Sequence, residues 1–117
     1  MNLLLTMVLI GNLTPTAYQS ISSQTDSSPY YTATGERVHN KGVALSRDLL
    51  KRWGGPLDYG DLIYIEDIGF KFVFDCMNER HKNRFDVWVS SDKEEKEFDK
   101  KFRGRKLKVY KIRIKEK

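Results

Sequence analysis

Two short runs with alternating apolar residues constrain the fold of this chain more than any other feature. Residues 72–75 and 84–89 each have the pattern of a strand, and the polar residues 76–83 between them are typical of a surface loop. Each run carries one carboxylate, Asp75 in the first and Asp86 in the second. Because aspartate is depleted in strands, these side chains either close strand ends or are directed toward one chemical task. Paired carboxylates are the usual means of breaking glycosidic bonds.

Length and composition place the chain among small soluble domains. Its 117 residues suffice for one domain with one modest core, and 39% hydrophobic with 32% charged residues are typical of a globular protein. The net charge of +5 favours an anionic partner, such as a cell-wall polymer, nucleic acid or a membrane surface, and a solvated surface explains it equally well. The single cysteine, Cys76, excludes an internal disulfide.

The apolar amino-terminal segment, residues 1–13, stands apart in the sequence. It is too short to span a bilayer, which takes about 20 residues, so no transmembrane segment is expected. Its length suits a secretory signal, yet no lysine or arginine precedes it and no small-residue cleavage pattern follows. It is therefore either a signal remnant or a first strand. We expect residues 14–117 to form one domain that acts as a monomer.

Short strands dominate the rest of the chain. Besides the strand at Asp86, alternation and turn residues predict strands at 14–19, 30–34, 42–45, 62–65, 70–74 and 106–114. The phase of the last strand changes between Val109 and Tyr110, which indicates either a bulge or burial on both faces of part of the strand.

Two short helices complete the pattern. Ser46 is a candidate N-cap for a helix over 47–53, and a capping box at Ser91 opens a charged helix that ends near Phe102, with Phe98 and Phe102 on one face. Since no βαβ rhythm is present, this order predicts a mainly β fold, a small barrel of about six strands.

An ordered set of short motifs resembles the three-aspartate domain family of cell-wall enzymes. In chain order the motifs are Thr-Ala-Tyr at 16–18, Asp26, Thr-Gly at 34–35, Gly-Val-Ala-Leu-Ser at 42–46, Tyr-Gly-Asp-Leu-Ile-Tyr-Ile at 59–65, Val-Phe-Asp at 73–75 and Arg-Phe-Asp-Val at 84–87. The resemblance covers nearly the whole chain from residue 14. It implies a six-stranded double-psi β-barrel with one or two short helices, similar to the catalytic barrel of membrane-bound lytic transglycosylase A.

The resemblance also implies an activity, that of a peptidoglycan lytic transglycosylase. Such an enzyme cleaves the bond between N-acetylmuramic acid and N-acetylglucosamine without water and leaves a 1,6-anhydro end. By motif, Asp86, Asp75 and Asp26 occupy the catalytic positions, with Asp86 as the essential acid. No cofactor is implied, the partner is the peptidoglycan glycan strand, and the expected location is the cell envelope or outside the cell, in a bacterial or phage-encoded protein.

Further residues are candidates for substrate contact, because they carry sugar-binding groups or lie beside the carboxylates. They are Thr16, Tyr18, Thr34, Lys82, Arg84 and Trp88. To act as an acid near neutral pH, Asp86 needs a raised pKa, which burial and the charge of Asp75 would favour and nearby cations would oppose.

The loop 76–83 departs from the family, whose corresponding segment is rich in glycine. Its lack of glycine leaves open a barrel that binds cell-wall carbohydrate without cleaving it, an expansin-like function. The basic residues 106–117 leave open a nucleic-acid or protein-binding barrel, although no aromatic side chains cluster with them to stack on bases. His39 and His81 have no metal-ligand spacing, so no metal site is expected.

Overall fold

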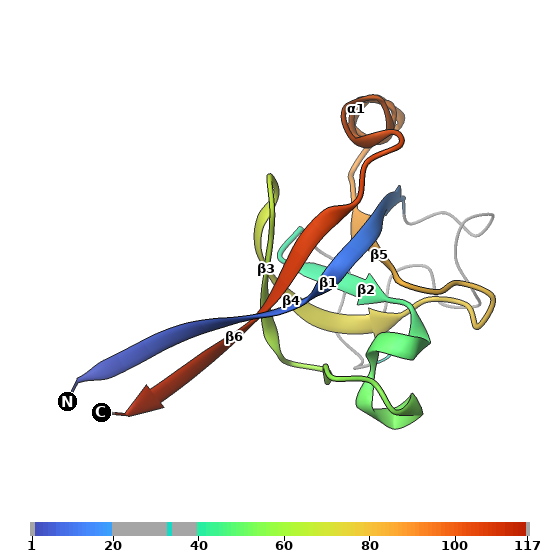
Figure 1. Ribbon diagram of the computed structural model, residues 1–117. Helices are drawn as coiled ribbons and strands as arrows, with labels where there is room; N and C mark the ends of the chain where they lie inside the picture. Colours follow the sequence, from blue (N-terminus) through green and yellow to red (C-terminus); the bar gives the residue numbers. More distant parts are fainter. Residues whose placement is uncertain (1, 20–32, 34–39, 117) are drawn as a thin grey trace.

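A computed structural model describes residues 2–19, 33 and 40–116, and Figure 1 shows their arrangement. This part of the chain contains six strands, one α-helix and two 3-10 turns. In chain order they are β1 (Leu3–Tyr18), β2 (Gly42–Leu45), η1 (Arg47–Leu49), η2 (Lys51–Trp53), β3 (Leu62–Ile65), β4 (Gly69–Cys76), β5 (Arg84–Trp88), α1 (Asp92–Phe102) and β6 (Leu107–Glu116).

The six strands form one mixed sheet that closes into a ring. The order around the ring is β1-β5-β2-β4-β3-β6, and β6 returns to β1. Two of the pairs are parallel, β1 with β5 and β2 with β4, and the other four are antiparallel. Strands distant in sequence are thus neighbours in space, and the mainly β, six-stranded architecture expected from the sequence is confirmed.

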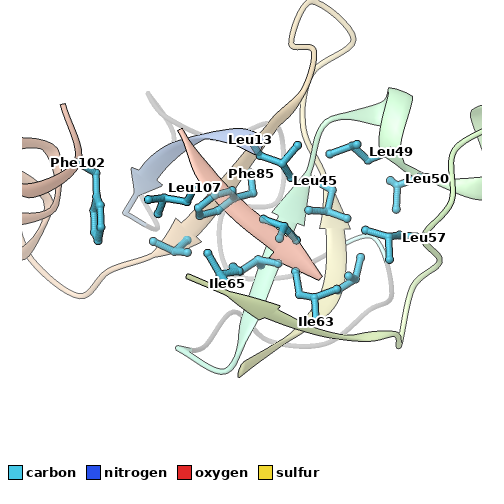
Figure 2. Close-up of a cluster of buried hydrophobic side chains, with 14 residues drawn as sticks. Leu13, Leu45, Leu49, Leu50, Leu57, Ile63, Ile65, Phe85, Phe102 and Leu107 are labelled. Carbon is cyan, nitrogen blue, oxygen red and sulfur yellow. The ribbon is translucent and has the colours of Figure 1, made fainter. Parts of the chain in front are cut away.

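The core fills the inside of the ring. Within the ring, every second residue of a strand points inward, because successive side chains of a strand point to opposite faces. Figure 2 shows Leu13, Leu45 and Phe85, which are all fully buried, converging from three different strands. The intervening residues of the same strands therefore face outward.

Local patterns in the sequence predicted most strand positions. β3 and β4 form the expected hairpin, in which Asp67 and Gly69 adopt positive φ angles. The bulge expected in the last strand lies in β1 instead. Leu9 and Gly11 pair with the consecutive residues Tyr110 and Val109, so the extra residue is Ile10 and β6 has none. The strand expected at 30–34 lies outside the described residues except for Ala33.

The helix predicted over 47–53 is wrong. Two separate 3-10 turns occupy this segment, because Leu50 between them is extended, with φ −102° and ψ 140°, and bridges to Leu57. Burial of Leu50 in the core outweighs helix continuity here. Ser46 makes no capping bond; its hydroxyl instead accepts a hydrogen bond from the Arg84 backbone N–H.

Helix α1 begins as predicted. The Ser91 hydroxyl accepts a hydrogen bond from the Glu94 backbone N–H, while the Glu94 carboxylate reaches back to Ser90. The rings of Phe98 and Phe102 lie 4.7 Å apart on one face of the helix.

The first and last strands extend beyond the ring as a two-stranded ribbon that carries both chain ends (Figure 1). Pairing runs from Leu3 with Glu116 to Leu13 with Leu107, so β1 passes without a break through the boundary expected between residues 13 and 14. Its inner part, from Leu13 onward, belongs to the ring.

Candidate active site

One outward row of side chains on β5 carries the expected acid. Arg84, Asp86 and Trp88 alternate with Phe85 and Val87, which belong to the core. Asp86 therefore faces away from the ring interior and is partly buried.

The register of four neighbouring strands brings four positions into line. Thr16 on β1 pairs with Asp86 on β5, Asp86 pairs with Ala44 on β2, and Ala44 pairs with Asp75 on β4. The strands of the two aspartates are not adjacent, because β2 lies between them. Two strand spacings separate their backbones, about 10 Å. Ala44 has the smallest side chain that could occupy the middle position without glycine's flexibility.

A bulge in β4 brings Asp75 into this row. Val43 pairs with Val73, but the next residue of β2, Ala44, pairs with Asp75 rather than with Phe74. Without the extra residue, Asp75 would stand opposite the core residue Leu45. Bulges redirect side chains in this way, and they are common next to active sites.

The hydroxyl of Thr16 has two acceptors on β5, the Asp86 carboxylate and the Phe85 carbonyl oxygen. The Thr16 oxygen lies 2.8 Å from Asp86 Oδ1 and 2.8 Å from the Phe85 carbonyl oxygen. The pKa of Asp86 is raised to about 7, mainly by burial and in smaller part by the charges of Glu95 and Asp75, against the opposing effects of the Thr16 hydrogen bond and Arg84.

Asp75 is held by backbone donors. Its Oδ1 accepts hydrogen bonds from the Ala33 N–H at 3.0 Å and the Cys76 N–H at 2.9 Å. Such donors stabilise the ionised form of a carboxylate. The two aspartates therefore have different environments, one withdrawn from water and one anchored to the backbone.

Tyr18 adds a buried phenol near both carboxylates. It pairs with Trp88, two residues along the strands from the pair of Thr16 and Asp86. Its hydroxyl is buried and has no hydrogen-bond partner in the described part of the chain. Burial raises the pKa of Tyr18, and the charges of Asp75 and Asp86 raise it further, so the phenol is neutral and available as a donor.

The other expected contact residues have different positions. Arg84 lies on the outer face of β5, two residues from Asp86, whereas Lys82 is exposed on the preceding loop. Asn83 takes the positive φ of 53° that a glycine would otherwise supply, and its side chain donates to the Asn12 carbonyl oxygen. The loop thus turns without glycine. Asp26 and Thr34 lie outside the described residues.

Two residues of the candidate site were not predicted from the sequence. Ala44 was part of a motif but had no assigned role, and Glu95 is on a helix that follows β5. The Gln19 side chain, at the end of β1, donates to Asp92 Oδ1 at 2.5 Å and to Glu95 Oε1 at 3.4 Å, which ties the start of α1 to this face.

Within residues 2–19, 33 and 40–116, no group of three or more His, Cys, Asp or Glu side chains could hold a metal ion. None of the described helices is long and apolar enough to cross a membrane. No protein-family model matches the chain, and no curated protein matches it.

Proposed function

We propose that this chain is a three-aspartate-type double-psi β-barrel that cleaves peptidoglycan as a lytic transglycosylase. The observation that carries the proposal is the position of Asp86. Its carboxyl has a pKa of about 7, a hydroxyl partner on the neighbouring strand and a second carboxylate in the same row. A carboxyl with that pKa can donate a proton and accept one at neutral pH.

In the first step Asp86 acts as a general acid. Its proton passes to the glycosidic oxygen as the bond from that oxygen to C1 of N-acetylmuramic acid breaks, and the bonding electrons remain on the oxygen. Protonation of the leaving group contributes a typical 10²–10⁴-fold acceleration.

In the second step the Asp86 carboxylate acts as a base. It takes the proton from the C6 hydroxyl of the same muramic residue while that oxygen bonds to C1. The product is a 1,6-anhydro sugar, Asp86 is again protonated, and no water is consumed. Because the nucleophile belongs to the substrate, no second base is needed to activate a water.

The Thr16 hydroxyl suits this change of role. It has one proton and two acceptors at equal distance. When Asp86 is ionised, the hydroxyl donates to the carboxylate. When Asp86 is protonated, the hydroxyl donates to the Phe85 carbonyl and accepts the proton of the acid. Both protonation states are therefore hydrogen-bonded without movement of the backbone.

Neighbouring groups supply binding and charge. The Tyr18 hydroxyl, which has no hydrogen-bond partner among the described residues, is a donor for a sugar oxygen, and Trp88 offers an indole beside Asp86 on the outward face. The charge of Asp75 contributes to the raised pKa of Asp86, after burial and the charge of Glu95, and a carboxylate in this row would offset the positive charge of an oxocarbenium-like transition state.

The test is mass spectrometry of the soluble products after incubation of the protein with purified peptidoglycan sacculi. We expect anhydro-muropeptides from the wild type and none from Asp86→Asn. Asp67→Asn is the matched control, because Asp67 is an exposed carboxylate at a positive φ that asparagine also adopts, and its activity should be unchanged.

Other products would contradict the proposal. Reducing ends in place of anhydro ends would make water the nucleophile. If neither protein forms a product and both sediment with sacculi, the chain is a carbohydrate-binding barrel without catalysis. Binding of DNA or RNA that weakens steeply with salt, without binding to sacculi, would favour a nucleic-acid-binding barrel.

A further inference from the structure

Most of the exposed large apolar side chains of the described residues lie on one continuous strip on the outside of the molecule. Ten large apolar side chains are exposed, and seven of them lie on this strip with exposed fractions of 47 to 64%. They are Leu3, Leu5, Met7 and Leu9 of β1, Phe70 and Phe72 of β4, and Ile114 of β6. An apolar patch of a few hundred Å² is often a functional contact surface.

Strand register shows that the strip is continuous. Across the ring, Leu9 pairs with Tyr110, Tyr110 with Tyr64, and Tyr64 with Phe70. The rings of Tyr64 and Phe70 pack edge to face at 5.0 Å. This aromatic row joins the ribbon of β1 and β6 to the outer face of β3 and β4.

The ribbon separates apolar from charged residues on its two faces. On one face, Leu5 pairs with Ile114 and Met7 with Ile112. On the other face, the β6 partners of Leu4, Thr6 and Val8 are cations, namely Lys115, Arg113 and Lys111. In two-layer β-structures, each layer has one apolar and one charged face, and the two apolar faces pack together. The ribbon has the pattern of one such layer.

The two edges of the ribbon differ as well. β1 has no charged residue from Leu3 to Tyr18, whereas β6 carries cations at every second position in the ribbon. Lysines on an edge strand discourage further pairing, and an uncharged edge does not. The cations of β6 therefore protect only that edge of the ribbon against pairing with a further strand.

We propose that the strip is the interface of a symmetric dimer with a second copy of this chain. The face is uncharged except for Glu116 at its tip, so a second identical face meets it without opposing charges at its centre. In a face-to-face dimer the cations of the ribbon remain in water. Against a lipid surface the same packing would direct Lys111, Arg113 and Lys115 away from the anionic head groups.

The dimension of the strip indicates the strength of the dimer. The ribbon from Leu3 to Leu9 is about 24 Å long and the aromatic row adds about 14 Å, from the ordinary rise and spacing of strands. A stable interface takes about 800 Å² from each partner, and a strip of this length and about 10 Å width covers roughly half of that. The dimer is therefore weak and transient, and its population rises with protein concentration.

Sedimentation equilibrium of the full chain at several concentrations tests this proposal. We expect the mean mass to rise from monomer to dimer for the wild type. Leu5→Lys, on the apolar face, should weaken the dimer at least tenfold, as should Phe70→Lys at the other end of the strip. Thr6→Lys is the matched control, because Thr6 adjoins Leu5 but lies on the cationic face, and it should dimerise like the wild type.

The variants also separate the alternatives. Circular dichroism identifies a variant that fails to fold, and the two strip substitutions lie on different strands, so one remains informative. A wild type that stays monomeric at concentrations of a few hundred micromolar would overturn the proposal. So would equal weakening by Thr6→Lys and Leu5→Lys, or a monomer that binds anionic phosphatidylglycerol vesicles through Leu5, which would assign the strip to a membrane. The strip does not include Asp86 or Thr16, so these results are independent of any cleavage activity.

Discussion

The hydroxyl of Thr16 lies 2.8 Å from the Asp86 carboxyl on the neighbouring parallel strand, at the same distance as from the Phe85 carbonyl oxygen. This bond lowers the pKa of Asp86 against the opposing effect of burial. The hydrogen bond from Thr16 therefore helps to set the proton affinity of the proposed acid.

Replacement of Thr16 should move the titration of Asp86. In Thr16→Val the hydrogen bond is lost with little change in shape, so the pKa of Asp86 should rise above about 7. Thr16→Ser keeps the hydroxyl and should leave the pKa nearly unchanged. Carbon-13 NMR of the aspartate carboxyl groups during a pH titration measures both. A lower pKa in the valine variant would refute the assigned bond.

Neutralising the nearby carboxylates should act in the opposite direction. Both Glu95 and Asp75 raise the pKa of Asp86, and Glu95 has the larger effect. Glu95→Gln should therefore lower the pKa of Asp86 more than Asp75→Asn does. The same NMR titration decides the order, and Glu97→Gln, on an exposed position of α1, is the control that should change nothing. The reverse order would mean that the charge of Asp75 acts on the Asp86 carboxyl more strongly than that of Glu95, against what the structure indicates.

The fold was predictable wherever local patterns decide it. Alternation located β5, the β3–β4 hairpin and β6, and the serine at 91 marked the start of α1. The helix prediction for residues 47–53 failed because Leu50 is buried in the core. Its contacts there are with residues distant in sequence, and they override the local helix preference.

The candidate site was predictable as a set of residues but not as a geometry. Asp86 and Asp75 were identified from their strands, yet the insertion of β2 between those strands depends on non-local pairing. The bulge at Phe74 and the approach of Glu95 likewise arise from how distant elements pack, and no pattern within either segment encodes them.

The bulge that directs Asp75 depends on a glycine in β2. A side chain at Gly42 would place its Cβ 2.3 Å from the Phe74 ring, so Gly42→Ala should destabilise the protein by about 1–3 kcal/mol through overpacking. Gly11→Ala, whose nearest neighbour would be 3.9 Å away, is the control and should have little effect. Urea unfolding followed by circular dichroism measures the free energies of unfolding. Equal stability of the two variants would show that the Phe74 ring can move aside freely.

The raised pKa of Asp86 should also appear in the pH dependence of stability. Since its folded-state pKa is about 7 and its ordinary value is 3.8, the folded protein binds this proton more tightly than the unfolded chain does. The contribution of Asp86 is fully favourable below pH 3.8, declines as the pH rises and is lost above about pH 7.

Asp86→Asn keeps the shape but cannot ionise. Its advantage in free energy of unfolding over the wild type should therefore grow from pH 4 to pH 8, by at most about 4 kcal/mol at the conversion of 1.36 kcal/mol per pKa unit. Urea unfolding of both proteins at several pH values gives this difference directly. A difference that stays constant with pH would mean that Asp86 titrates like an exposed aspartate, which would remove the basis for its role as the acid.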